Sequence, residues 1–484
     1  MSHTDLCWLP ATEMAAAIRA RKLSPVELVD ALIGRIHQLN PAVNAYCTLA
    51  EEAARQAARA AEAAVLRGDN MGLLHGVPVS IKDLLFTSAV RTMRGSRIYE
   101  QFVPDHDAPS VAKLKASGAI LLGKTTTPEF GWKGATDSPL TGVSRNPWNR
   151  ARSCGGSSGG AAAAVAAGMG PLAVGTDGAG SIRIPASFCG IVGLKPSRGR
   201  VAVYPPSAVG FLSHAGPMTR TVRDAALMLS VMAGPDARDP LSIETPPEDY
   251  LAACEGAVEG MKGLRVAWSA DLGYAPVDPE VRRLTEAAAH RFEELGCEVE
   301  AVDPGWDNPH EWHAVLWCAV NGGRHAQRLA ERPEWIEPSL REFIERAQRH
   351  SAIDLGQALL ARTAFYEQAR VFMARYDLLL TPTMPCAAWS VERGPERIEG
   401  RPSPTMFDRL PFTYPFNLTG WPAATVPCGF TSEGLPVGLQ IVAGRHQDAL
   451  CLRASAAFEA AQPWAQVRPE IGTLDPNGGA TGGD

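Results

Sequence analysis

The feature that most constrains this chain is a run of very small residues from Gly155 to Ser181. It reads GGSSGG, then AAAAVAAGMG, then PLAVGTD and finally GAGS. Glycine-rich turns let the backbone approach a ligand closely and adopt positive φ angles. Between the two serine-bearing turns, the pattern predicts a helix over about 160–168 and a strand over about 172–176. The alanines and glycines of that helix would let it pack closely on a sheet and return the second turn to the first.

Two hydroxyl groups in this run, those of Ser157 and Ser181, are candidate nucleophiles. A serine on such a turn can attack an electrophile when a base is close. Backbone N–H groups at Gly178, Ala179 and Gly180 are candidate donors to the oxyanion that forms. The same turns could instead bind phosphate or another anion. A Ser-His-Asp triad is a further alternative, although the run holds no histidine and no GxSxG elbow.

The totals describe an ordinary globular chain. Its 484 residues include 46 basic and 52 acidic side chains, which give a formal net charge of −6 and no general attraction to polyanions. No uninterrupted apolar stretch of about 18 residues is present, so we expect no membrane span. The N-terminal segment lacks the apolar run of a secretory signal. Because the ten cysteines are scattered without a CxxC pair, we expect free thiols and a cytoplasmic protein.

Alternating helix and strand signals predict an α/β fold. Ser24 before Pro25 predicts a helix start, and Asn40-Pro41 predicts the end of that helix. In GVPVSIKDL the apolar side chains alternate with Pro78, Ser80 and Lys82, which predicts a strand. Its spacing alone favours a solvated Lys82.

Two motifs are formal matches that their surroundings argue against. Residues 118–125, GAILLGKT, fit the phosphate-loop pattern. Their inner residues are typical of a buried strand, however, and a helix precedes them, so a nucleotide-binding protein is the weakest of the functions considered. His310-Glu311-Trp312-His313 resembles half of a zinc-protease motif, but the second histidine stands at i+3 instead of i+4. We therefore expect no metal and no cofactor.

Long motifs in the right order resemble the amidase signature family. They are GVPVSIKDL, GKTTTPEFG, GGSSGGAAAAVAAG, GTDGAGSIRIPASFCGIVGLKPSRGRV, FNLTGWPAATVPCGF and GLPVGLQIV. The resemblance covers roughly residues 10 to 465 and is weakest between about 240 and 410. It implies a single large α/β/α domain, in which helices cover both faces of a central mixed sheet.

The resemblance also divides the chain into segments. N-terminal helices over 1–70 would pack on an amidase signature core over 71–235, which residues 411–465 would complete. The variable region over 236–410 would shape the substrate pocket. Residues 466–484, which end in PNGGATGGD, would form a flexible tail.

The resemblance further implies a Ser–cis-Ser–Lys triad. Ser181 matches the family's nucleophile, Ser157 matches the serine that follows a cis peptide bond, and Lys82 matches the base, contrary to what spacing alone favours. A buried lysine can accept a proton because burial lowers its pKa. Many members carry two glycines before the nucleophile, and here Ala179 replaces the first. Alanine would be strained there if the position required a positive φ.

Together these residues imply an amidase that cleaves the C–N bond of a small carboxamide or anilide through an acyl-enzyme on Ser181. An alternative within the family is the glutamine-hydrolysing component of a tRNA-dependent amidotransferase, which needs partner subunits and a polar site for glutamine. Four aromatic residues suggest a more apolar pocket wall and favour the first function. They are Phe412, Tyr414, Phe416 and Trp421. We expect a small-molecule amide as the partner, no nucleic acid or membrane, and a homodimer as one option for assembly.

Overall fold

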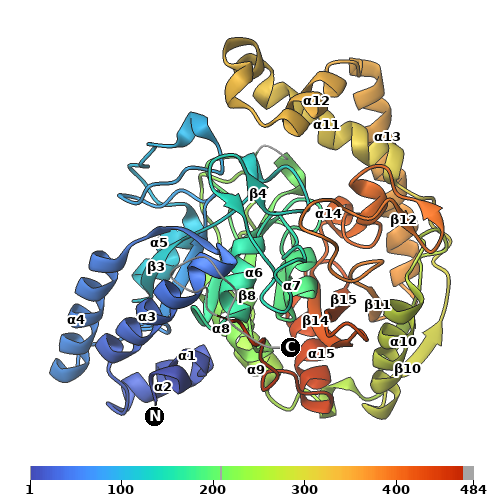
Figure 1. Cartoon of the computed structure of the whole chain (residues 1–484). Helices are drawn as coiled ribbons and strands as arrows, with labels where there is room; N and C mark the ends of the chain where they lie inside the picture. Colours follow the sequence, from blue (N-terminus) through green and yellow to red (C-terminus); the bar gives the residue numbers. More distant parts are fainter. Residues whose placement is uncertain (1, 208–209, 473–484) are drawn as a thin grey trace.

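The computed structural model describes residues 2–207 and 210–472. At their centre lies one eleven-stranded mixed sheet in the order β1-β3-β2-β6-β8-β7-β14-β15-β11-β9-β10 (Figure 1). In that order the strands are Tyr46–Leu49, Ile120–Thr125, Pro78–Lys82, Leu172–Asp177, His214–Thr219, Val192–Lys195, Ala423–Phe430, Pro436–Ala443, Leu378–Pro382, Arg265–Trp268 and Glu298–Ala301. Two small hairpins lie outside this sheet: β4 (Asp137–Ser138) with β5 (Gly142–Val143), and β12 (Arg397–Ile398) with β13 (Arg401–Pro402).

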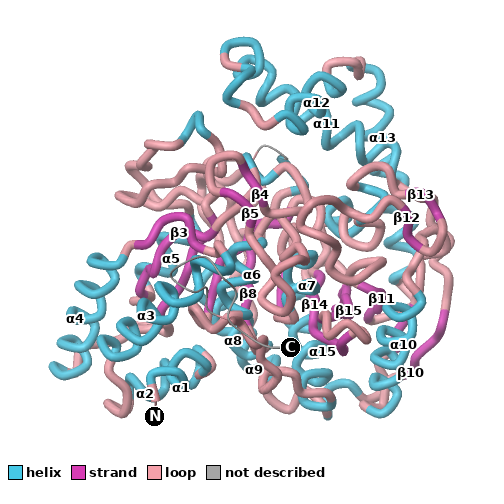
Figure 2. The backbone as a smooth tube through the Cα atoms, in the orientation of Figure 1, coloured by secondary structure: helices cyan, strands magenta, loops and turns pink. Residues whose placement is uncertain are grey.

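Helices flank the sheet in two sets (Figure 2). Helices α6 (Gly159–Ala166) and α7 (Arg183–Cys189) pack on each other and on the central strands, while α8 (Val222–Met232), α10 (Pro279–Glu294) and α15 (Asp448–Ala461) make up the second set. The expected α/β/α fold with a mixed sheet is therefore confirmed. The other helices are α1 (His3–Trp8), α2 (Ala11–Arg19), α3 (Pro25–Val43), α4 (Glu51–Arg67), α5 (Pro109–Ala116), α9 (Tyr250–Cys254), α11 (His310–Glu331), α12 (Pro338–Ala347), α13 (Ala352–Met373) and α14 (Pro415–Thr419).

The sheet is parallel where the serine-rich run crosses it. Strand β2 pairs in parallel with both β3 and β6, whereas β6 pairs antiparallel with β8. Parallel strands present their carboxyl ends at one edge of the sheet, where α/β proteins commonly bind ligands. Lys82 ends β2 and Asp177 ends β6. The residues that follow both strands are therefore brought to the same edge.

Helix α6 packs inside the molecule because its side chains are very small. All of its residues are buried, and it contacts β1, β2, β3, β6 and β8. A Cβ atom built on Gly160 would lie 2.2 Å from Thr126 Oγ1 and 2.6 Å from the Ala45 carbonyl oxygen. The helix thus approaches its neighbours through glycine, as the composition of the run predicts.

Helix α3 begins where the sequence predicts but ends later. Ser24 Oγ accepts hydrogen bonds from two N–H groups of the first turn (3.1 and 3.2 Å), as a helix cap does. The helix continues to Val43, so the predicted end at Asn40-Pro41 is wrong. A proline in the last turn removes only one backbone donor. Asn44, in the left-handed conformation at φ 55°, ends the helix instead.

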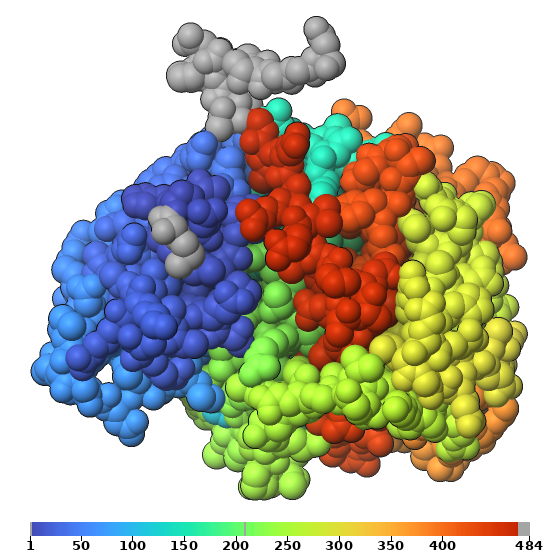
Figure 3. Space-filling view, turned by 90° about the horizontal axis from the view of Figure 1, so that it is seen from below, coloured from blue at the N-terminus to red at the C-terminus, as the bar shows by residue number. Residues whose placement is uncertain are grey.

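The two ends of the described chain meet on one face of the molecule (Figure 3). The Arg468 guanidinium lies 4.7 Å from the ring centroid of Trp8, so the last described residues contact the first helix. The last helix also contacts the middle of the chain, because Glu459 of α15 accepts the N–H of Val222 at the start of α8 (3.0 Å). From residue 473 onward, the tail expected over 466–484 lies outside the described residues. Among the described residues, no helix is both long and apolar enough to cross a bilayer.

Replacing Gly160 by alanine should destabilise the fold, whereas the same replacement at Gly34 should not. A Cβ has no room at Gly160, and overpacking of this kind costs about 1–3 kcal/mol. Gly34 lies in α3 with nothing within 4 Å of its Cβ position, so alanine there should stabilise the helix by about 0.5–1 kcal/mol. Urea unfolding of both variants measures the difference, and equal midpoints would contradict this account of α6 packing.

Candidate active site

Lys82 is completely enclosed at the carboxyl end of β2 (0% exposed). Its Nζ donates hydrogen bonds to Ser157 Oγ (2.7 Å) and to Thr176 Oγ1 (2.9 Å). The solvated lysine favoured by spacing alone is therefore wrong. Alternation places Lys82 opposite the apolar side chains, but every residue of β2 is buried, because both faces of a strand inside an α/β sheet are covered.

Burial lowers the pKa of Lys82 well below its usual range, and the charge of Asp177 opposes this shift without cancelling it. The two hydroxyl groups are the only hydrogen-bond partners of the Nζ among the described residues. Both are neutral, so neither holds the lysine in its charged form as a carboxylate would. A neutral amine in this position can accept a proton.

Ser157 and Ser181 line one cavity. Ser157 follows a cis peptide bond from Gly156. The Ser181 carbonyl oxygen accepts the N–H of Ser158 (3.1 Å), which ties the two serine turns together. Ser181 is 8% exposed, and its hydroxyl has no hydrogen-bond partner in the described part of the chain. The structure thus brings Lys82 and Ser157 into direct contact and leaves the Ser181 hydroxyl free in the same cavity.

The three residues expected as oxyanion donors directly follow β6. The Gly180 N–H donates to Asp177 Oδ1 (2.7 Å), so this expected donor is engaged elsewhere. The N–H groups of Gly178 and Ala179 have no hydrogen-bond partner among the described residues. The left-handed conformation in this turn falls on Gly180, at φ 121°, and not on Ala179. Alanine therefore replaces the family's glycine without backbone strain.

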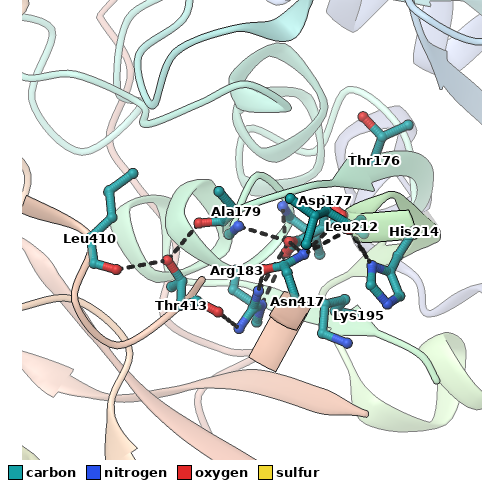
Figure 4. Close-up of polar contacts among 12 residues, drawn as sticks. Thr176, Asp177, Ala179, Arg183, Lys195, Leu212, His214, Leu410, Thr413 and Asn417 are labelled. Carbon is teal, nitrogen blue, oxygen red and sulfur yellow. Dashed lines mark hydrogen bonds and ion pairs between the residues drawn. The ribbon is translucent and has the colours of Figure 1, made fainter. Parts of the chain in front are cut away.

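Asp177 holds this turn in place (Figure 4). Its fully buried carboxylate accepts hydrogen bonds from the N–H groups of Gly180 and Ile182. It also accepts two from the Arg183 guanidinium, both at 3.0 Å, so Asp177 and Arg183 form a buried ion pair. Burial alone would raise the pKa of Asp177. Arg183 and Asn417 outweigh burial, so this pKa lies well below its usual range and the carboxylate stays ionised.

Residues from the C-terminal part of the chain complete this network. Arg183 Nη2 donates to Asn417 Oδ1 (2.7 Å), and Arg183 Nη1 donates to Gln440 Oε1 (2.8 Å). Thr413 Oγ1 donates to the Ala179 carbonyl oxygen (2.7 Å). Sequence reasoning missed these side chains because they lie more than 200 positions from the turn that they hold. The available signal is a polar residue inside an otherwise apolar segment, such as the glutamine in GLQIV.

Thr176 was also missed. It precedes Asp177 at the end of β6, and its hydroxyl is the second partner of Lys82. The Ser158 hydroxyl donates to the Thr176 carbonyl oxygen (3.1 Å) and accepts the Thr176 N–H (3.2 Å). Strand β6 pairs with β2, the strand that carries Lys82. Once this pairing is known, a hydroxyl near the end of β6 can be expected close to Lys82.

The cavity has an apolar part and a cationic part. Its apolar lining consists of Leu84, Leu85, Phe86, Phe130, Val203 and Trp317, with prolines beside them. Arg94 and Arg324 also line it, and among the described residues no aspartate or glutamate does. The aromatic wall expected from Phe412, Tyr414, Phe416 and Trp421 is wrong. These four are buried and do not line the cavity.

One face of α11 lines the cavity. This helix lies within residues 236–410, the region expected to shape the substrate pocket. Trp317, Asn321 and Arg324 line the cavity at positions i, i+4 and i+7 of the helix. Residues with that spacing share a helix face. The spacing was readable from the sequence, but nothing in it indicated that this face would turn toward Ser181.

The phosphate-loop match over residues 118–125 lies in and beside strand β3. Gly123 and Lys124 lie in β3, and Lys124 Nζ donates to the Leu85 carbonyl oxygen and to Thr92 Oγ1 (both 2.7 Å). The phosphate-loop match is thus a buried strand, as its residues predict.

The two histidines of the HEWH motif have structural partners. His310 lies 3.3 Å from Asp408, and the His313 ring stacks on Tyr414 with centroids 4.4 Å apart. Among the described residues, no group of three potential ligands is arranged to hold a metal ion. None of the described histidines is hydrogen-bonded to Ser157 or Ser181, so a Ser-His-Asp arrangement is not formed.

Known proteins resemble this chain over nearly its whole length. The family model Amidase matches residues 27–452. An acylamidase of Rhodococcus erythropolis is 43% identical over 480 residues, which cover 97% of this chain and 98% of the relative. A glutamyl-tRNA(Gln) amidotransferase subunit of Moorella thermoacetica is 36% identical over 499 residues, which cover 97% of this chain and 99% of that relative.

Solved structures agree with the sequence relatives. A bacterial aryl acylamidase of the amidase signature family has a TM-score of 0.89 and 35% identity, covering 95% of this chain and 97% of that chain. A 6-aminohexanoate cyclic dimer hydrolase has a TM-score of 0.86 and 32% identity, covering 96% of this chain and 99% of that chain. Because the family model and these full-length relatives span the same core that carries Lys82, Ser157 and Ser181, this chain belongs to the amidase signature family of amide hydrolases.

Proposed function

We propose that this amide hydrolase cleaves the C–N bond of a small carboxamide or anilide through an acyl-enzyme on Ser181. The observation that carries the proposal is the enclosed hydrogen bond between Lys82 and Ser157 (2.7 Å), beside a cavity that Ser181 also lines. The names of the Rhodococcus acylamidase and of the aryl acylamidase support this substrate class.

In the first half of the reaction, Ser181 gives its proton to Ser157 while Ser157 passes its own proton to neutral Lys82. The Ser181 oxygen attacks the amide carbon, and the carbonyl electron pair moves onto the carbonyl oxygen. The N–H groups of Gly178 and Ala179 hold this oxyanion. Each such donor typically contributes about 3 kcal/mol of transition-state stabilisation.

In the second half, the oxyanion collapses and the C–N bond breaks. The leaving nitrogen takes the proton that Lys82 returns through Ser157, and the acyl group remains as an ester on Ser181. Water then attacks the ester and gives a proton to Lys82 by the same route. Lys82 returns that proton to the Ser181 oxygen as the ester bond breaks, so the overall balance is amide plus water to acid plus amine.

The glutamine-hydrolysing component of a tRNA-dependent amidotransferase is the second candidate. Relatives of that name favour it, as do the two cavity arginines, which suit an α-carboxylate. The α-ammonium group of glutamine argues against it. Among the described residues that line the cavity there is no aspartate or glutamate, so that ammonium would lose its water without gaining a counter-charge.

We further propose a cytoplasmic location. All ten cysteines are free in the structure, and seven of them are buried, among them Cys154 and Cys189. Free thiols persist in reducing compartments, which is the support for this location.

Replacing Ser181 by alanine should abolish amide hydrolysis while leaving the fold intact. Loss of a nucleophile that acts in a relay lowers kcat by at least about 10³-fold. Ser197→Ala is a matched control, because Ser197 is buried, lies outside the cavity, and its hydroxyl has no hydrogen-bond partner in the part of the chain that the structure describes. Aniline release from a simple anilide and thermal unfolding are measured for both variants. Retained activity in the Ser181 variant would remove Ser181 from the mechanism.

The rate should depend on Lys82 being neutral. Burial lowers the pKa of Lys82 well below its usual range, so the neutral base forms at a lower pH than for an ordinary lysine, and kcat/KM should fall as the pH drops through that lowered pKa. Lys82→Arg keeps a positive charge at every accessible pH and should lose about 10²–10⁴-fold in rate. The pH–rate profiles of both proteins check this. A profile in which activity appears only as the pH rises toward the ordinary lysine pKa would contradict a neutral Lys82.

Substrate choice separates the two candidate functions. The purified chain alone should hydrolyse butyranilide with a kcat/KM at least about tenfold above that for glutamine, because the glutamine ammonium finds no counter-charge in the cavity. Aniline and ammonia release give the two rates. Turnover of glutamine together with no turnover of anilides would replace the first function by the second.

A further inference from the structure

Two arginines line the cavity that holds Ser157 and Ser181. Arg94 lies in the loop after β2, and Arg324 lies on α11. In the described part of the chain, neither forms an ion pair. Arg324 Nη1 donates to the Pro206 carbonyl oxygen (2.9 Å), whereas the buried Arg94 Nε has no hydrogen-bond partner among the residues that the structure describes. Buried donors are nearly always satisfied in folded proteins, so the Arg94 Nε, which has no partner among the described residues, is a donor that a ligand oxygen in this cavity can satisfy.

A third arginine adds to the positive charge. Arg94 and Arg328 lie 5.3 and 5.7 Å from the ring centroid of Tyr99, and 5.7 and 5.6 Å from that of Phe130. Burial, followed by the charges of Arg324 and Arg328, lowers the pKa of Arg94 to about 10. Arg94 is therefore still charged at neutral pH. Contact with aromatic rings offsets part of the cost of holding these charges together, but a ring cannot satisfy the N–H donors as an oxygen can.

The backbone of Arg94 is hydrogen-bonded to the residue that directly follows β2. Its N–H donates to Asp83 Oδ2 (2.9 Å), and Asp83 is the neighbour of Lys82. Its carbonyl oxygen accepts the N–H of Phe130 (2.8 Å). Arg94 also has φ 57°, a conformation that is uncommon for a residue other than glycine and is found at ligand sites. These contacts hold Arg94 at a set position relative to the reacting groups.

We propose that Arg94 and Arg324 bind a carboxylate carried by the substrate, so that the preferred substrate is an amide with an anionic group away from the scissile bond. This inference rests on the proposed amidase function and narrows its substrate class. A guanidinium matches a carboxylate in shape and charge. The apolar side chains of Phe86, Phe130 and Trp317, which line the same cavity, suit the carbon skeleton between the amide and the carboxylate.

The experiment compares each acid with its own uncharged ester. The substrates are the monoanilides of succinic, glutaric and adipic acid and their methyl esters, together with 4-acetamidobenzoate and its methyl ester. The first three pairs place the carboxylate on the acyl side, and the last places it on the amine side. In the wild-type protein, at least one acid should exceed its ester by about tenfold or more in kcat/KM, mainly through a lower KM.

Three variants assign that preference to the cavity arginines. Arg94→Gln and Arg324→Gln should each reduce the acid-to-ester ratio about tenfold. Arg332→Gln is the matched control, because Arg332 is exposed at the end of α11 and does not line the cavity. It removes the same formal charge and should leave the ratio within about twofold of wild type. An equal fall of the ratio in all three variants would mean a general charge effect and would overturn the proposal.

The outcomes separate this inference from the proposed function. If the amide bond of each methyl ester is cleaved as fast as the amide bond of the matching acid, the carboxylate site is overturned. The amidase function then still stands. Turnover of none of the eight compounds would contradict the proposed function. In that case, protection experiments decide the inference. A sulfonyl fluoride labels the cavity, and the acids should protect the protein from labelling at about tenfold lower concentration than the esters. Equal protection would overturn it.

Discussion

The hydrogen bond from enclosed Lys82 to Ser157 is the interaction on which the rest of the site depends. In the proposed mechanism this contact is useful only if the lysine is neutral, and a neutral lysine requires removal from water. The fold provides this because β2 lies inside the sheet and every one of its residues is buried. The small residues of α6 serve the same end, since they let this helix contact β2 and β6 closely. The glycine-rich run therefore supports the proposed chemistry through packing as well as through the two serines it carries.

Burial has opposite consequences at two neighbouring positions, and the difference lies in their partners. Within the described residues, Lys82 is hydrogen-bonded to hydroxyl groups alone, so burial lowers its pKa. Asp177 is just as buried, but Arg183 and Asn417 keep it ionised. An ionised Asp177 can accept the N–H groups of the turn before Ser181 and so orient the turn. Lys82 thus has the environment that the proposed proton transfer needs, while Asp177 keeps its charge and holds the backbone of the turn.

The sequence allowed much of this to be predicted, and what it did not allow has physical causes. The helix that follows Ser157 and the strand that leads to Ser181 follow from local pattern. Lys82 could not be placed by pattern, because alternation says which face a side chain occupies and not whether that face is covered. It was placed by resemblance to a family. The sequence did not reveal the polar residues that only the folded chain brings to the turn or the cavity, which are Thr413, Asn417, Arg94 and Arg324. The aromatic residues from Phe412 to Trp421 were assigned to the cavity, but they fill the core.

The central claim is that buried Lys82 activates Ser181 through Ser157, and covalent trapping with a sulfonyl fluoride tests it without knowledge of the natural substrate. Peptide mapping of the wild-type protein should place the adduct on Ser181. The rate of labelling should fall by about 10²-fold or more in Lys82→Ala, since the relay then has no base. An adduct on another residue, or an undiminished labelling rate of Ser181 without Lys82, would contradict the account.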